Sequence, residues 1–292
     1  MKRFFSLIIC AAMLLGAFAG AYAENTQSRA VIGADLTNEQ ISLVYQIFGI
    51  SQGSVPQLRL TNAEERKFLE GYVDSAVIGT RSISCVYVEL LSPGSGMKVT
   101  TNNITWCDAD FYISALSTAG ITDARIIVTA PFPVSGTAAL AGIYKAYEDM
   151  TGQTLDSDAK DVGTQELTVT GELAQEIGST DSGSIVQELK RMLSETGKMT
   201  DEQLREEIVK ISSGYHVSLT DTQIKQLVSL CRSLERLDPD TFKSKVDDVQ
   251  GTISKVSGAK SQIEEYIETI RNIIASLQGI IERIQSILDK FG

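Results

Sequence analysis

A short segment of the chain, Ser135 with Gly136 and Thr137, has the residue types and the setting of an anion-binding turn. It follows an apolar run, residues 125–129, that predicts a buried strand, and it precedes a small-residue stretch that predicts a helix. A turn that opens a helix presents free backbone N–H groups, which can bind a carboxylate or another anion. This segment is therefore the first candidate for a ligand site.

Two prolines set the expected geometry of this turn. Pro131 and Pro133 restrict the backbone to extended conformations, so we expect Ser135 to be held in a fixed direction as the cap of the helix. The simpler interpretation, which we favour, is that Ser135 only caps the helix. Gly136 and the alanines after it would then let the helix lie close to the sheet.

The rest of the sequence offers few residues for catalysis or metal binding. His216 is the only histidine, and its position between two expected helices suggests a structural or exposed residue. The sequence has no phosphate-binding loop, dinucleotide fingerprint or Cys-x-x-Cys pair, so we expect no cofactor and no metal site. Cys85 and Cys107 could form one disulfide in an oxidising compartment. The alternative, which we favour, is that both are small buried residues.

The first 23 residues have the pattern of a signal peptide. Lys2 and Arg3 precede an apolar run, and Ala-Tyr-Ala at 21–23 fits the small-x-small cleavage rule. We expect cleavage after Ala23, the alternative being an uncleaved N-terminal anchor. Cleavage lowers the formal charge from −11 to −13, because two basic residues are lost, and this disfavours nucleic acid as a partner. No later segment has the roughly 18 consecutive apolar residues of a membrane helix, so we expect no integral membrane segment after cleavage.

The order of the expected elements predicts an α/β sandwich around a small mixed sheet at 24–152, of α+β or α/β class. The β-rich run 82–91 and the next strand, beginning at 97–101, are separated by Ser-Pro-Gly-Ser-Gly and predict a hairpin. A helix at 108–119 and the strand after it complete a βαβ pattern. From 153 to 238 only helical periodicity occurs, so we expect an all-helical domain there.

Four helices are predicted by one and the same start signal. A threonine followed three residues later by glutamine or glutamate forms a capping box, in which each side chain bonds to the backbone N–H of the other residue. The signal occurs at Thr37, Thr61, Thr200 and Thr220. Each of these threonines is expected to begin a helix.

The last segment, residues 239–292, has the clearest periodicity of the chain. Of fifteen positions spaced alternately by four and three from Phe242, fourteen are apolar and only Lys260 breaks the row. Such a stripe predicts a long amphipathic helix, or a helical hairpin that folds back near Gly258. We expect residues 240–292 to mediate self-association or docking to a protein partner.

Several segments together resemble the YpuA-like family of exported Gram-positive bacterial proteins of unknown function. The strongest is residues 130–140 (APFPVSGTAAL), followed by the dipeptides at 142–143 and 145–146. Residues 33–37 (GADLT), 78–84 (IGTRSIS) and 118–121 (TAGI) also fit the family. The resemblance covers roughly residues 31–230. It implies secretion and a cell-envelope setting, and it brings no catalytic residues.

These observations favour an exported envelope protein that binds a ligand or a partner and assembles through its helical tail. The candidate ligand-binding residues are Arg81, Ser135, Gly136 and Thr137. The alternative is an envelope enzyme that acts on a cell-wall polymer or peptide in the groove beside Ser135. We favour the binding protein, because the sequence shows no pairing of a nucleophile with a base.

Overall fold

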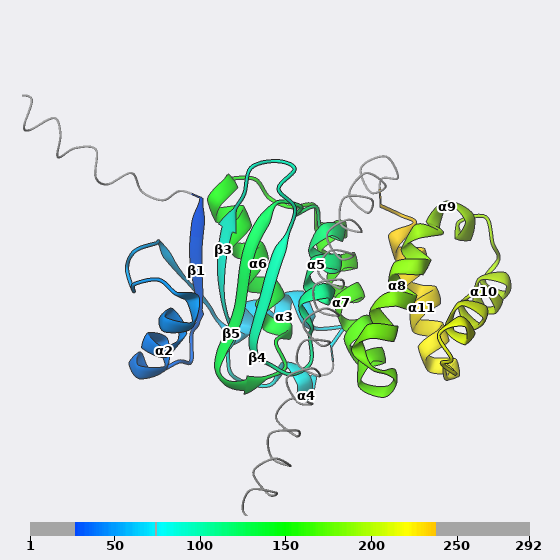
Figure 1. Ribbon diagram of the computed structural model, residues 1–292, viewed down its shortest axis with the longest axis horizontal. Coiled ribbons are helices and arrows are strands. Elements are labelled where there is room, and N and C mark those ends of the chain that lie inside the picture. Colours follow the sequence, from blue (N-terminus) through cyan, green and yellow to red (C-terminus); the bar gives the residue numbers. More distant parts are fainter. Residues whose placement is uncertain (1–26, 74, 238–292) are drawn as a thin grey trace, which may run out of the picture.

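The computed structural model describes residues 27–73 and 75–237, which form one sheet and a set of surrounding helices (Figure 1). The signal-peptide pattern at 1–23 and the periodic segment at 239–292 lie outside the described residues. The strands are β1 (Ser28–Gly33), β2 (Gln57–Leu60), β3 (Cys85–Leu90), β4 (Lys98–Ile104) and β5 (Ala124–Val134). The helices of the first half are α2 (Asn38–Phe48), α3 (Asn62–Leu69), α4 (Ser75–Ile78), α5 (Ala109–Thr118) and α6 (Thr137–Thr151). Those of the second half are α7 (Ser157–Ile177), α8 (Ser179–Arg191), α9 (Leu193–Thr196), α10 (Asp201–Gly214) and α11 (Asp221–Leu234).

The five strands form one mixed sheet in the order β2-β1-β3-β5-β4. The outer pairs, β1 with β2 and β4 with β5, are parallel, whereas β3 runs antiparallel to both β1 and β5. A small mixed sheet in the N-terminal half with helices after it confirms the predicted fold, which is of the α+β class.

The predicted hairpin is wrong. The strands β3 and β4 are not neighbours, because β5 lies between them and pairs with both. Ile126 and Val128 of β5 are completely buried. A central position therefore removes more apolar surface from water for β5 than it would for β4. The turn between β3 and β4 exists, but a turn signal does not specify which strand a neighbour will pair with.

Two strands, β1 and β2, were not predicted from the sequence. Residues Ala30, Val31 and Ile32 of β1 are at most 1% exposed, so β1 is a core strand. Its partner β2 is a four-residue edge strand with only Leu60 buried. A run this short gives little periodicity, and its pairing with β1 is a long-range contact.

Helices cover the two faces of the sheet unequally (Figure 1). Helices α5 and α6 pack on one face, in the largest apolar cluster of the described chain, and α2 packs on the other. Helix α6 lies close to the sheet at Gly142, where a Cβ atom would come within 3.3 Å of Val86 and 3.6 Å of Val31. The expectation that small residues bring this helix onto the sheet is confirmed.

All four predicted capping boxes are present. The N-cap threonines of α2, α3, α10 and α11 each accept a hydrogen bond from the third helical residue, whose side chain bonds back to the N-cap backbone. These helices begin where the sequence predicts, because the signal is contained within four residues. No helix of the two described ranges is long and apolar enough to cross a bilayer.

Helix α7 joins the two halves of the molecule, because it packs in both cores. Its Leu167 belongs to the cluster under the sheet, whereas Val162, Val169 and Leu173 belong to a second cluster with α8, α10 and α11. On the sheet side, Gly163 lies against the backbone of α5, where a Cβ would come within 2.6 Å of the Ala115 carbonyl oxygen. The expected boundary near residue 153 thus precedes a helix that both cores share.

A buried ion pair fixes α7 and α8 against α5. The Lys190 ammonium lies 2.8 Å from a carboxylate oxygen of Glu166, and both side chains are 1% exposed. Lys190 also donates to the hydroxyls of Ser114 and Thr118, at 3.0 Å each, and both hydroxyls donate to the Glu166 carboxylate. Burying two charges is costly unless each is paired and hydrogen-bonded, and both conditions are met here.

We predict that Lys190→Met destabilises the protein by about 3–5 kcal/mol, because it leaves the Glu166 carboxylate buried without a counter-ion. The double change Lys190→Met with Glu166→Leu should cost less than Lys190→Met alone. Denaturant unfolding of the full chain measures both values.

A surface lysine provides the control. Lys210 pairs with Glu207 while 76% exposed, so Lys210→Met should change the free energy of unfolding by about 1 kcal/mol or less. Equal effects of Lys190→Met and Lys210→Met would show that the buried pair does not hold the helices together.

Candidate functional site

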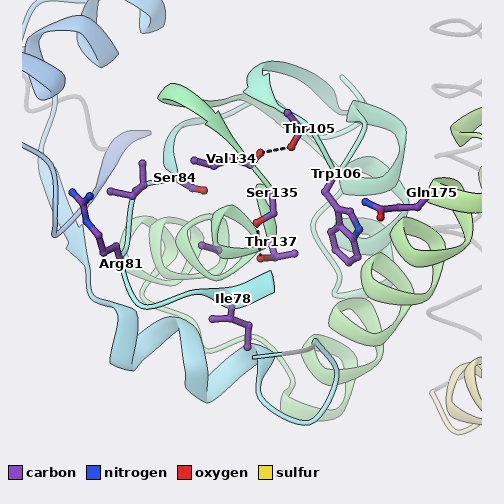
Figure 2. Close-up of a pocket in the computed structure, with 11 residues that line it drawn as sticks. Ile78, Arg81, Ser84, Thr105, Trp106, Val134, Ser135, Thr137 and Gln175 are labelled. Atoms are coloured by element: carbon purple, nitrogen blue, oxygen red, sulfur yellow. Dashed lines mark hydrogen bonds between the residues drawn. The ribbon is translucent and has the colours of Figure 1, made fainter. Parts of the chain in front are cut away.

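A pocket of about 440 Å³ lies where β3 begins and where β4 and β5 end. Figure 2 shows Arg81 and Gln175 on opposite sides of this pocket, with Ser135 and Thr137 between them. We name it the Ser135 pocket. Its walls come from the segment after α4, the loop after β4, the β5–α6 junction and α7, and it is lined by Ile78, Arg81, Ile83, Ser84, Thr105, Trp106, Val134, Ser135, Thr137, Ala138 and Gln175.

A bulge at the end of β4 shapes one wall of the Ser135 pocket. Asn103 has a positive φ of 57°, and its side-chain amide donates to the Ala130 carbonyl at 2.8 Å. The register between β4 and β5 shifts at this residue. The next two residues then bond across to the β5–α6 junction: Thr105 N–H donates to Val134 and Trp106 N–H to Ser135. The loops after β4 and β5 therefore form one connected wall.

The cap of α6 differs from the prediction. The N-cap is Gly136, with φ 94°, and the helix begins at Thr137, so Ser135 does not cap it. The strand β5 continues to Val134 through both prolines, and its pairing with β3 ends at Thr129. The prolines therefore remove no ladder hydrogen bond on that side. The strand ends five residues later than the predicted end at residue 129, and the helix cap lies one residue later than predicted.

A buried hydrogen bond from Tyr112 fixes the Gly136 turn. The buried Tyr112 hydroxyl donates to the Gly136 carbonyl at 2.5 Å, and burial raises the pKa of this phenol well above its usual value. A Cβ atom on Gly136 would come within 2.7 Å of that hydroxyl and would also collide with Ile104. Only glycine fits this position without displacing its neighbours.

The structure brings three of the four predicted site residues to the wall of one pocket. Arg81, Ser135 and Thr137 line the Ser135 pocket, and Gly136 forms the turn between the last two. Thr137 is 1% exposed, and its hydroxyl lies 3.5 Å from that of Ser135. Arg81 is exposed at the rim; its guanidinium donates to the Asp35 carbonyl and is turned away from Ser135 (Figure 2).

Buried polar contacts fix the segment that carries Arg81. The Ser82 N–H donates to the Asp35 carboxylate at 2.7 Å, and the Ser82 hydroxyl donates to the Glu65 carboxylate. Burial of Glu65 raises the pKa of its carboxyl to about 7. Gly33 passes so close to Ser82 that a Cβ would come within 2.7 Å of the Ser82 carbonyl carbon. Two of the segments that carry the family resemblance, 33–37 and 78–84, thus lie against each other beside the Ser135 pocket.

Sequence reasoning missed Trp106 and Gln175. Trp106 is the single tryptophan of the chain and is half-buried, with its indole ring packed on Gly171 of α7. A Cβ on Gly171 would come within 3.1 Å of three indole carbons. A single tryptophan just after a strand could have been recognised in the sequence as a candidate site residue. The packing of α7 against it is a tertiary contact, which the spacing of residues along the chain does not reveal.

The pocket offers several hydroxyl groups. None of the described residues that line it is a carboxylate, a histidine or a cysteine, which are the side chains that most often act as a general base. His216 is exposed, as expected. In the described part of the chain, no group of histidine, cysteine and acidic residues is placed to hold a metal ion.

The cysteines within the described ranges, Cys85, Cys107 and Cys231, are free and buried. Cys85 packs in the cluster on the α2 face of the sheet, whereas Cys107 packs in the cluster on the α5 and α6 face. The structure therefore has no bond between them, and the sheet lies between their two clusters. Burial raises the pKa of both thiols, that of Cys85 to about 12, so both are poor nucleophiles.

Sequence comparisons identify relatives of this chain. Residues 32–256 match the family model DUF1002, described as a protein of unknown function. The chain is 34% identical over 227 residues to the uncharacterized protein YpuA of Bacillus subtilis (strain 168), a match that covers 77% of this chain and 78% of that protein. No solved structure matches the chain. The resemblance to the YpuA-like family is confirmed.

We predict that Gly136→Ala destabilises the protein by about 2–4 kcal/mol, because it combines an unfavourable φ with two collisions. Gly152 at the other end of α6 is the matched control: its φ is also positive, at 65°, but nothing lies within 4 Å of an added Cβ. Gly152→Ala should therefore cost only about 1 kcal/mol. Equal losses in thermal unfolding would contradict the close packing inferred at Gly136.

Proposed function

The chain belongs to the DUF1002 family, and we propose that it is an exported cell-envelope protein that binds an envelope ligand in the Ser135 pocket. We further propose that residues 240–292 give it a helical tail for self-association or for docking to a protein partner. Neither nucleic acid nor an integral membrane segment has a part in this proposal.

The observation that carries the proposal is the composition of the Ser135 pocket. Concave sites with a few converging polar groups are the usual places for ligands. Here hydroxyls, a side-chain amide and an indole ring surround a volume of about 440 Å³, and Arg81 is the only charged residue among the described residues of the lining. The N-terminus of the fifteen-residue helix α6 adds a partial positive charge at Thr137. In a chain of net charge −11, such a pocket favours a ligand that carries a carboxylate or another anionic group.

Export is supported by the sequence pattern and by the family resemblance. Residues 1–23 combine a basic start, an apolar run and a small-x-small site. The assembly role is supported by the apolar stripe of residues 240–292.

Binding is tested with soluble fragments of digested Gram-positive cell wall. Because Trp106 is the only tryptophan and lines the pocket, its fluorescence reports occupancy directly. We expect the fragments to change this fluorescence, and we expect Ser135→Leu, which fills the pocket, to abolish the change.

The control is Ser213→Leu, on an exposed face of α10 away from the pocket, which should respond as the wild type does. Melting curves establish that both variants are folded. No response in the wild type, or an unchanged response in Ser135→Leu, would contradict binding in this pocket.

Export and assembly are tested together in a producing Gram-positive cell. The full-length chain and a variant lacking residues 240–292 are recovered from the envelope and the medium, and their intact and native masses are measured. We expect processing after Ala23 in both, and a native mass above that of one chain only in the full-length protein or in its complex with a partner. An unprocessed cytoplasmic protein would refute export. If the deletion changed neither the number of chains per particle nor the presence of a partner, the role of the tail would be refuted.

A further inference from the structure

A second pocket adjoins the Ser135 pocket and shares one wall with it. This second pocket has a volume of about 430 Å³ and is lined by Thr105, Trp106, Asp108, Phe111, Ala174 and Gln175. Three of these residues, Thr105, Trp106 and Gln175, also line the Ser135 pocket. We name it the Asp108 pocket. A ligand long enough to leave one pocket would cross these three shared residues to enter the other.

The two pockets carry opposite charges. Arg81 lines only the Ser135 pocket, and Asp108 lines only the Asp108 pocket. Neither residue has an ion-pair partner within residues 27–73 and 75–237, and both are exposed. Asp108 occupies the N-cap position of α5, yet its side chain makes no capping hydrogen bond. Each end of the double pocket therefore has a charged side chain without an ion-pair partner among the described residues. To meet a ligand, the Arg81 guanidinium has to leave the Asp35 carbonyl and turn toward Ser135.

The shared wall can bind an amide. Gln175 is exposed, and its side chain makes no hydrogen bond to another described residue, so it offers both donors and an acceptor. The Thr105 hydroxyl donates to the Val134 carbonyl at 3.0 Å, which leaves its oxygen free to accept. Beside them lies the half-buried indole of Trp106, a surface for an aliphatic or planar group.

From these features we infer that the double pocket binds a short extended peptide, with a carboxylate directed to Arg81 and an ammonium directed to Asp108. This inference rests on the proposed binding role of the Ser135 pocket and names its ligand class. The peptide backbone crosses Thr105, Trp106 and Gln175. There its amide groups exchange their hydrogen bonds to water for hydrogen bonds to the side chains of Thr105 and Gln175. A neutral glycan has no use for the two charges, and a polyanion is repelled by Asp108 and by the acidic protein as a whole.

The test uses tetra-alanine with free ends, its N-acetyl form, its C-terminal amide and, for comparison, chitotetraose. None of these compounds absorbs where tryptophan is excited selectively, so the fluorescence of Trp106 in the full chain measures each affinity. We expect tetra-alanine to bind most tightly, and removal of either end charge to weaken binding about three- to tenfold.

Two variants assign each charge to its end of the pocket. In Arg81→Gln the C-terminal amide should bind as well as free tetra-alanine does, whereas the loss on N-acetylation should persist. Asp108→Asn should show the reverse pattern. Lys225→Gln and Asp158→Asn, at exposed positions of α11 and α7, are the charge-matched controls and should behave as the wild type does.

Three results would overturn the inference. Equal affinities for the three peptide forms, or no response to any of them, would exclude a charge-paired peptide. A response to chitotetraose alone would also exclude it, while leaving the Ser135 pocket as a binding site. Failure of the proposed function itself is recognised separately, by the absence of any response to wall fragments.

Discussion

The buried ion pair of Glu166 and Lys190 is the constraint on which the rest of the structure depends. Two charges without access to water are stable only when every neighbour is in place, so the pair specifies how α7 and α8 meet α5. The consequence extends to the pocket, since the same helix α7 supplies Gly171 beneath Trp106 and Gln175 in the wall. The buried Glu166–Lys190 pair thereby fixes the position of α7, which forms one wall of the pocket.

The opposite side of the site is built from backbone conformations that few residues tolerate. Asn103, at the bulge of β4, and Gly136, at the β5–α6 junction, both have positive φ. Hydrogen bonds join the residues that follow Asn103 to those that precede Gly136. The Tyr112 hydroxyl bonds to one of these turns from beneath. Strained backbone persists where its surroundings determine it, and it is often found beside functional sites. The backbone beneath the Ser135 pocket is thus fixed by its contacts, whereas Arg81 at the rim is exposed and bonds only to the Asp35 carbonyl among the described residues.

Features determined within a few residues could be predicted from the sequence, and those that depend on distant contacts could not. The helix starts at Thr37 and Thr220 follow from capping boxes that are complete in four residues. Pairing of β5 between β3 and β4 depends on burial of Ile126 and Val128, which the local turn signal does not contain. The site shows the same division. Residues 135–137 were recognisable as a turn before a helix, whereas the place of Trp106 requires α7, which comes much later in the chain.

The central claim is that the space around Trp106 binds a ligand, and one resonance tests it most directly. A chain with a single tryptophan gives a single indole N–H signal in a ¹H–¹⁵N spectrum. On addition of tetra-alanine, this signal should shift together with the backbone amides of Thr137 and Ala138, which line the same pocket. An indole signal that stays in place, while the peptide shifts amides elsewhere or none at all, would contradict the claim.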